Sequence, residues 1–97
     1  MKIWVDGARP APEGYVWCQT VNEAKDTILV LELHATVHES NRVELIDLDY
    51  DNGDYIKLMD WLVERGTLYP LAFHSQNCAG MEYMKRMYKR YWLKESL

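Results

Sequence analysis

Four short apolar segments, each followed at once by polar residues, limit most strongly what this chain can fold into. They are residues 2–5, 15–18, 43–48 and 70–73. Short runs of this kind, rich in β-branched and aromatic residues and bounded by Gly, Pro, Asn or Asp, are typical of strands. The segments that follow three of them are long enough for helices, so the pattern predicts an α/β domain.

The first helix is predicted after the second strand. Thr20 and Glu23 have the spacing of a capping box, in which each side chain satisfies a backbone N–H at the start of a helix. Apolar residues then continue with a helical period to about Leu33. Residues 34–42 have no clear period and predict a loop.

Two further helices follow the third and fourth strands. Asp54 is expected to cap the second helix, Gly66 to end it, and the third helix to begin at about Gly80. The resulting order is strand, strand, helix, strand, helix, strand, helix. This order, with such short apolar strands, favours a mainly parallel sheet covered by helices.

Length and composition limit the class of protein. With 97 residues, the chain has room for one hydrophobic core, so we expect a single domain over residues 1–97. Cys18 and Cys78 match no metal or redox spacing and are interpreted as reduced thiols of a cytoplasmic protein, with one disulfide as the alternative. The chain shows neither a signal peptide nor an apolar run long enough to cross a membrane, so no membrane role is expected.

Polar side chains follow three of the predicted strands. They are Asp6, Asp49 with Asp51, and His74. Because the carboxyl ends of parallel strands meet at one edge of a sheet, these groups are expected to share a crevice. Clustered carboxylates suit Mg²⁺ or Mn²⁺, and His74 could exchange a proton near neutral pH.

Each of these residues also has a structural explanation. Asp51 lies in Asp-Asn-Gly, which is good turn chemistry by itself, and an Asp at the end of a strand often caps a backbone amide. A histidine at a strand end is more often a hydrogen-bonded structural residue. Only the convergence of several segments favours a functional site.

Two other metal motifs fit less well. Asp47, Asp49 and Asp51 match the first ligands of an EF-hand, but Leu58 stands where the bidentate Glu is required. Residues 34–38 (HATVH) have the histidine spacing of a zinc motif without its glutamate. We give neither calcium nor zinc much weight.

The C-terminal segment is basic although the chain has a net charge of −4. Its basic residues are Lys85, Arg86, Lys89, Arg90 and Lys94. A solvated helix face is the simpler interpretation, whereas weak contact with nucleic acid is the alternative, because tyrosines lie among these residues.

Taken together, three segments carry a resemblance to a known family. The segments IWVDGARPAPEGYVW, LIDLDYDNG and FHSQNCAGMEYM occur in this order, and the chain resembles the cyclic-phosphate processing receiver domain family. That family is a compact relative of the bacterial response-regulator receiver. The resemblance implies a small receiver-like (flavodoxin-like) three-layer fold, with a mainly parallel four-stranded sheet flanked by about three helices.

The resemblance also implies roles for particular residues. The matching positions are Asp6, Arg9, Asp49, Asp51, His74 and Asn77. The three aspartates would hold a divalent metal, Mg²⁺ or Mn²⁺. Arg9 would bind a phosphate, His74 would exchange a proton, and Asn77 would orient a group through its amide. A structural salt bridge to one of the acids is the alternative for Arg9.

Two departures from the family pattern affect the expected function. Gly7 stands where the family has a second Asp, and Tyr50 replaces a His. The first hypothesis is a metal-dependent phosphoesterase that acts on a cyclic phosphate, either a 2′,3′-cyclic RNA end or a cyclic nucleotide. The second is a catalytically degenerate module that binds a phosphorylated ligand or a protein partner. Phosphorylation by a histidine kinase is disfavoured, because the acidic pair of an ordinary receiver is reduced to Asp6.

Overall fold

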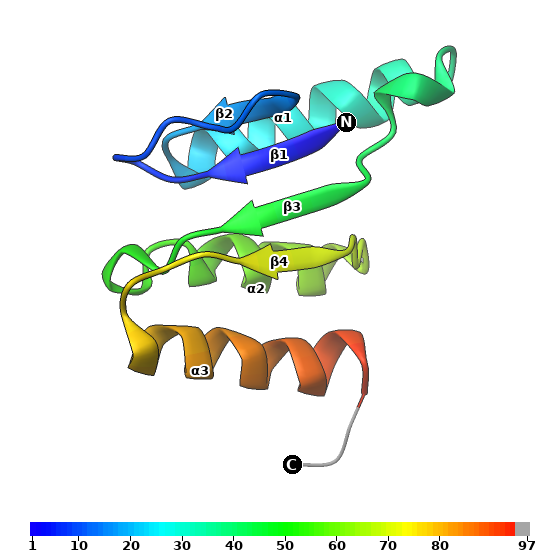
Figure 1. The fold of residues 1–97 in the computed structure, drawn as a ribbon. Helices are drawn as coiled ribbons and strands as arrows, with labels where there is room; N and C mark the ends of the chain where they lie inside the picture. Colours follow the sequence, from blue (N-terminus) through cyan, green and yellow to red (C-terminus); the bar gives the residue numbers. More distant parts are fainter. Residues whose placement is uncertain (95–97) are drawn as a thin grey trace.

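Four parallel strands form the sheet of the computed structural model, which describes residues 1–94 (Figure 1). They are β1 (Lys2–Val5), β2 (Tyr15–Cys18), β3 (Leu45–Leu48) and β4 (Leu71–Phe73). Their order across the sheet is β2-β1-β3-β4, and every described pair of neighbours is parallel. All four strands therefore end at the same edge.

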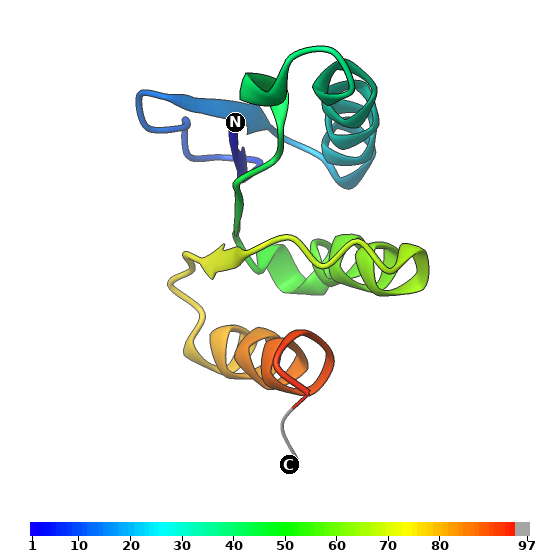
Figure 2. The same ribbon diagram turned by 90° about the vertical axis from the view of Figure 1, so that its right-hand side faces the viewer.

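Three α-helices accompany the sheet. They are α1 (Val21–Ala35), α2 (Ile56–Arg65) and α3 (Cys78–Met87), and the last continues into a π-helical turn, Tyr88–Trp92. The expected receiver-like α/β class, with a four-stranded parallel sheet and three helices, is confirmed. Figure 2 shows α1 and α2 on one face of the sheet and α3 beside its β4 edge. The described residues therefore form two layers where three were expected.

Alternating side chains explain why the helices lie on that face. Ile3 and Val5 of β1 are fully buried, as are Ile46 and Leu48 of β3. They pack against the buried apolar residues of α1 and α2 in one hydrophobic core. Burial of this apolar surface is the main force that holds the helices to the sheet.

The opposite face of the sheet is covered by no helix among residues 1–94. Trp4, Tyr15 and Asp47 lie on it half-buried, and Trp17 is 40% exposed. The ring of Tyr15 contacts the edge of Trp4 at a centroid distance of 5.9 Å. This face is therefore an aromatic surface that the Asp6–Gly14 loop crosses near β1 and β2.

The local helix signals were predicted with mixed success. At the start of α1, the Thr20 hydroxyl accepts a hydrogen bond from Glu23 N–H, and the Glu23 carboxylate accepts one from Gln19 N–H. Gly66 ends α2 in the left-handed conformation, with φ of 73°. The predicted cap at Asp54 was wrong, because α2 begins at Ile56 with no side-chain cap at its N-terminus.

Other boundaries differ by a few residues. Helix α1 continues to Ala35, β3 begins at Leu45, and α3 begins at Cys78. The predicted loop over residues 34–42 contains one 3₁₀ turn, Glu39–Asn41. In α3, the earlier start results from Asn77, whose side chain caps the helix.

The two cysteines are not joined by a disulfide. Cys18 is buried and Cys78 is exposed, and both are free thiols. Burial raises the pKa of the Cys18 thiol. Among residues 1–94, no helix has both the length and the apolar composition needed to cross a bilayer.

Candidate functional site

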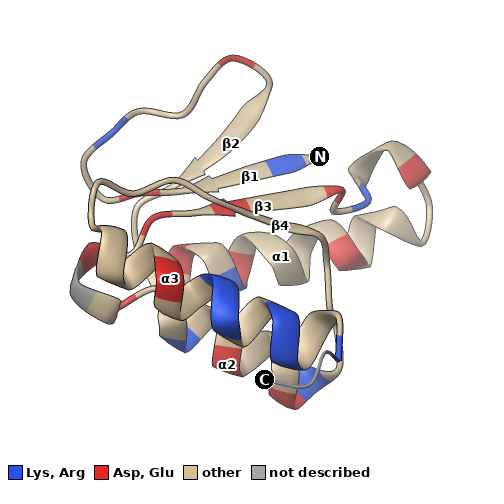
Figure 3. Cartoon of the chain, turned by 60° about the horizontal axis from the view of Figure 1, so that its bottom comes forward, with Lys and Arg blue, Asp and Glu red and all other residues tan. Residues whose placement is uncertain are grey.

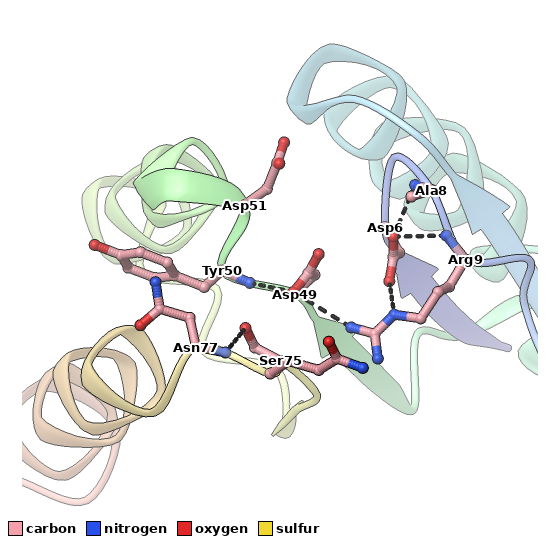
Figure 4. Close-up of a pocket in the computed structure, with 9 residues that line it drawn as sticks. Asp6, Ala8, Arg9, Asp49, Tyr50, Asp51, Ser75 and Asn77 are labelled. Atoms are coloured by element: carbon pink, nitrogen blue, oxygen red, sulfur yellow. Dashed lines mark hydrogen bonds and ion pairs between the residues drawn. The ribbon is translucent and has the colours of Figure 1, made fainter.

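A cleft of about 420 Å³ lies where the strands end. It is lined by Asp6, Ala8, Arg9, Asp49, Tyr50, Asp51, Ser75, Gln76 and Asn77 (Figure 4). These residues follow β1, β3 and β4, which are neighbours in the sheet. Five of the six expected site residues line the cleft, and the sixth, His74, contacts Asp6, one of the residues that line it.

Asp6 is the most completely bonded group in the site. Its carboxylate has no exposed surface and accepts hydrogen bonds from the backbone N–H groups of Ala8 and Arg9, both at 2.8 Å. Arg9 Nε donates to Oδ2 at 2.9 Å, and His74 Nε2 lies 3.0 Å from the same oxygen. Burial alone raises the pKa of Asp6, but these hydrogen bonds outweigh it and the pKa is lowered.

His74 is held between two carboxylates. Its Nδ1 lies 2.7 Å from Asp47 Oδ1, while its Nε2 faces Asp6. The Trp4 ring stacks on the imidazole at a centroid distance of 3.6 Å, with 7° between the planes. Because an ionised carboxylate only accepts hydrogen bonds, both contacts are hydrogen bonds when each ring nitrogen carries a hydrogen.

Arg9 bridges the two sides of the cleft. In addition to its bond to Asp6, Nη2 lies 3.4 Å from Asp49 Oδ1 and 3.5 Å from the carbonyl oxygen of His74. The salt bridge considered as an alternative role for Arg9 is therefore formed. The side chain is still 45% exposed, and Nη1 has no hydrogen-bond partner within residues 1–94. This free edge of the guanidinium can bind an anion.

The β3 side of the cleft is less completely bonded. Asp49 Oδ1 accepts a hydrogen bond from Tyr50 N–H at 2.8 Å, and its second oxygen has no partner among the described residues. Asp51 is exposed and has a φ of 42°, a left-handed conformation that Asp tolerates better than most residues. Two carboxylates therefore remain available to a ligand on this side.

The first turn of α3 forms the third wall. Asn77 Oδ1 accepts a hydrogen bond from Gly80 N–H, and Asn77 N–H donates to Ser75 Oγ. The Asn77 amide oxygen is therefore used to cap the helix. Its amide nitrogen lies beside Tyr50 at the cleft (Figure 4).

Two glycines near the cleft lie in close contact with tyrosine side chains. A Cβ at Gly7 would lie 3.0 Å from the Tyr55 hydroxyl, which donates a hydrogen bond to the carbonyl of Gln19. A Cβ at Gly80 would lie only 2.3 Å from the Tyr50 ring. The Tyr55 hydroxyl would therefore crowd a side chain at position 7, and the Tyr50 ring packs directly against the backbone of α3 at Gly80.

The acids also affect Tyr55. Burial, followed by the negative charges of Asp51, Asp6 and Asp49, raises the pKa of Tyr55 to about 12. The same three aspartates line the cleft with a single cation, Arg9. The residues that line the cleft therefore carry more negative than positive charge.

The predicted metal ligands fit a metal only in part. Both carboxylate oxygens of Asp6 already accept hydrogen bonds from N–H donors. The positively charged Arg9 guanidinium lies between Asp6 and Asp49, where a metal ion bound to both would have to lie. Within residues 1–94, no group of three or more His, Cys, Asp or Glu side chains is arranged for a metal ion. Asp49 and Asp51 remain suitable, because Mg²⁺ commonly binds to one or two carboxylates together with the phosphate of a ligand.

Two residues of this site were not predicted from the sequence. Asp47 was considered only as an EF-hand ligand, yet it holds Nδ1 of His74, and Trp4 stacks on the same ring. The signal for Asp47 was its place inside an apolar strand, where a carboxylate needs a partner. The catalytic and metal-binding roles expected from the resemblance stay predictions.

Comparison with known families agrees with this arrangement. A family model described as the cyclic-phosphate processing receiver domain matches residues 1–90. No curated protein and no solved structure matches the chain. The match extends over the sheet, the three helices and every residue that lines the cleft. This chain therefore belongs to the cyclic-phosphate processing receiver domain family.

Proposed function

We propose that the cleft binds a cyclic phosphate ester together with a divalent metal and opens the ester ring by hydrolysis. The ester would be a 2′,3′-cyclic RNA end or a cyclic nucleotide. One observation carries the proposal. Arg9 and Asp49 lie side by side in the cleft, and each keeps polar atoms without a hydrogen-bond partner among residues 1–94: Nη1 of the Arg9 guanidinium and the second carboxylate oxygen of Asp49. One group suits a phosphate oxygen and the other a metal ion or a water.

The charge of the cleft supports a metal in this proposal. Three aspartates and one arginine line it, so a phosphate anion entering alone would meet a surplus of like charge. A divalent cation on Asp49 and Asp51 would offset that repulsion. When bound, Mg²⁺ or Mn²⁺ would polarise the phosphoryl oxygen.

The protein residues supply binding and orientation. Arg9 binds the phosphate, and Asp6 holds the guanidinium in place through its Nε atom. His74 keeps Asp6 and Asp47 in position, because both of its ring nitrogens are engaged with them. Water adds across one P–O bond of the ring, and the single ring-opened product carries a hydroxyl group and a phosphate monoester.

A second candidate is binding without turnover. It is supported by the close approach of the Tyr55 hydroxyl to Gly7, which would crowd a second acid at the end of β1. The full bonding of Asp6 supports it as well. In this case the domain would recognise a cyclic phosphate in a regulatory role. A cytoplasmic location stays a prediction in either case.

The experiment is hydrolysis of 2′,3′-cyclic AMP with added Mn²⁺, followed by ³¹P NMR of the monoester product. The wild type is compared with Asp49→Asn, Arg9→Gln and the control Glu64→Gln, an exposed acid outside the cleft. We expect turnover in the wild type and the control, loss in Asp49→Asn and a large decrease in Arg9→Gln. Calorimetric binding of the nucleotide without turnover would favour the second candidate, whereas neither binding nor turnover would contradict both.

A further inference from the structure

A groove between α2 and α3 lies outside the cleft and combines arginines with exposed tyrosines. It has a volume of about 240 Å³ and is lined by Asp60, Tyr83, Arg86, Met87, Arg90 and Tyr91. Tyr83 is 51% exposed and Tyr91 39%. The Arg90 guanidinium lies 5.4 Å from the centroid of the Tyr91 ring. Exposed aromatic rings beside arginines are the features on which single-stranded nucleic acids stack.

The charge around the groove is positive although the chain is acidic. From Cys78 to Trp92 the basic residues are Lys85, Arg86, Lys89 and Arg90, with Glu82 as the acid. Neither groove arginine forms a salt bridge within residues 1–94. Asp60, from α2, is the acid that lines the groove. Figure 3 shows the basic bands along α3.

The cleft and the groove lie along the same helix. Asn77, which lines the cleft, caps α3, and the helix rises about 1.5 Å per residue. Tyr83 is therefore about 9 Å and Arg90 about 20 Å further along the axis. A chain of a few nucleotides is long enough to span this distance.

The helix widens into a π-helical turn directly after α3, in the same region as the groove. Leu93 N–H donates to the carbonyl of Tyr88 at 3.2 Å, which closes a π-helical turn over Tyr88–Trp92. Such wide turns are rare and occur often at functional sites. This one contains both Arg90 and Tyr91.

We propose that this groove binds single-stranded RNA, namely the nucleotides that precede a 2′,3′-cyclic phosphate held in the cleft. Arg86 and Arg90 bind backbone phosphates, and Tyr83 and Tyr91 stack on bases. This inference rests on the proposed function and narrows its substrate class to an RNA end in preference to a free cyclic nucleotide.

The test measures binding of a 5′-fluorescein oligoribonucleotide that ends in a 2′,3′-cyclic phosphate, by fluorescence anisotropy. The variant Arg86→Gln/Arg90→Gln is compared with Lys85→Gln/Lys89→Gln, which makes the same charge change outside the groove. We expect the arginine variant to bind at least about tenfold more weakly than the lysine control. Loss of two phosphate contacts should also decrease the slope of log K against log[salt] by about 1.4.

Several outcomes would overturn the inference. Equal losses in the two double variants would indicate a nonspecific charge effect, and equally effective competition by polyglutamate would indicate a site for any polyanion. Unchanged RNA affinity in the arginine variant, with normal turnover of 2′,3′-cyclic AMP, would contradict the groove alone. Groove-dependent RNA binding without any turnover or binding of 2′,3′-cyclic AMP would instead contradict the proposed function.

Discussion

The two sides of the cleft use the same residue type in opposite ways. On the β1 side, Asp6 is buried and every acceptor position is occupied by an N–H group of the protein. On the β3 side, Asp49 keeps one oxygen without a described partner, and Asp51 is exposed. An aspartate that ends a strand is therefore structural when its own loop supplies enough donors, and remains available for a ligand when the loop does not.

The largest effect on stability is expected from Asp6→Ala. This change leaves the His74 ring and the backbone N–H groups of Ala8 and Arg9 without their buried acceptor, and each unsatisfied buried group costs about 1–3 kcal/mol. Asp51→Asn, on the exposed side, keeps a residue that tolerates the left-handed conformation and should stay within about 0.5 kcal/mol of the wild type. Urea unfolding measures both free energies of unfolding. Similar losses in the two variants would abolish the contrast between the sides.

The second largest loss of stability is expected where Gly80 of α3 packs against Tyr50, which follows β3. In Gly80→Ala the new methyl group would overlap the Tyr50 ring, and overpacking of this kind costs about 1–3 kcal/mol. The double variant Gly80→Ala/Tyr50→Ala removes the overlap and should recover part of the loss. Thermal unfolding of the two variants and of Tyr50→Ala alone tests this. An unaffected Gly80→Ala protein would show that Tyr50 does not rest on the helix.

A third variant would make the two sides alike. Gly7→Asp adds a carboxylate to the β1 side but crowds the Tyr55 hydroxyl, whereas Gly7→Asp/Tyr55→Phe provides the space. We expect the two changes to be coupled by about 0.5–3 kcal/mol in a double-mutant cycle of stability. Mn²⁺ affinity, measured by electron paramagnetic resonance, should increase in the double variant. Additive stabilities with unchanged Mn²⁺ affinity would show that Tyr55 does not exclude an acid from position 7.

The smallest effect at neutral pH concerns protonation. Because the folded protein holds the pKa of Asp6 below its ordinary value of 3.8, the carboxylate stabilises the fold above that pH. This contribution is lost as the pH falls below about 4 and through the lowered pKa. Glu32 has a lowered pKa as well, although burial opposes the effect of Arg65, so the measurement belongs in a Glu32→Gln background.

In that background, acid unfolding followed by circular dichroism should still show a loss of stability below about pH 4. Adding Asp51→Asn should leave the profile unchanged, because Asp51 is exposed and makes no ion pair in the described chain. A free energy of unfolding that does not change below about pH 4 in the Glu32→Gln protein would contradict the role assigned to Asp6.

Local chemistry made much of the fold predictable. Thr20, Glu23 and Gly66 act within a few residues of themselves, so their spacing indicates where helices begin and end. The convergence of Asp6, Asp49 and Asn77 was also predictable, because parallel strands end at one edge. The error at Asp54 arose because the preceding 3₁₀ turn already leads into α2 through backbone hydrogen bonds.

The remainder depended on contacts between distant segments. No sequence pattern links Gly7 to Tyr55 or Tyr50 to Gly80, because each pair meets only after the strands are assembled. The sequence contained a partial signal for the uncovered sheet face. Lys2 and Asp47 are charged residues of otherwise apolar strands, and both lie at positions that alternate with the buried ones. A carboxylate inside a strand could have been interpreted as a sign of an open face.

The hydrogen bonds that hold the turn over residues 6–9 have a consequence for ligand affinity. Trp17 Nε1 donates to the carbonyl of Asp6 at 2.7 Å, and Trp4 Nε1 donates to that of Arg9 at 2.9 Å. Two indoles from the sheet thus fix both ends of the turn, while Asp6 restrains the arginine side chain. The entropy of ordering this arginine is lost during folding and not when a phosphate arrives. The proposed anion site is therefore preorganised, and substitutions of Trp4 or Trp17 should weaken phosphate binding although neither indole would contact the phosphate in this proposal.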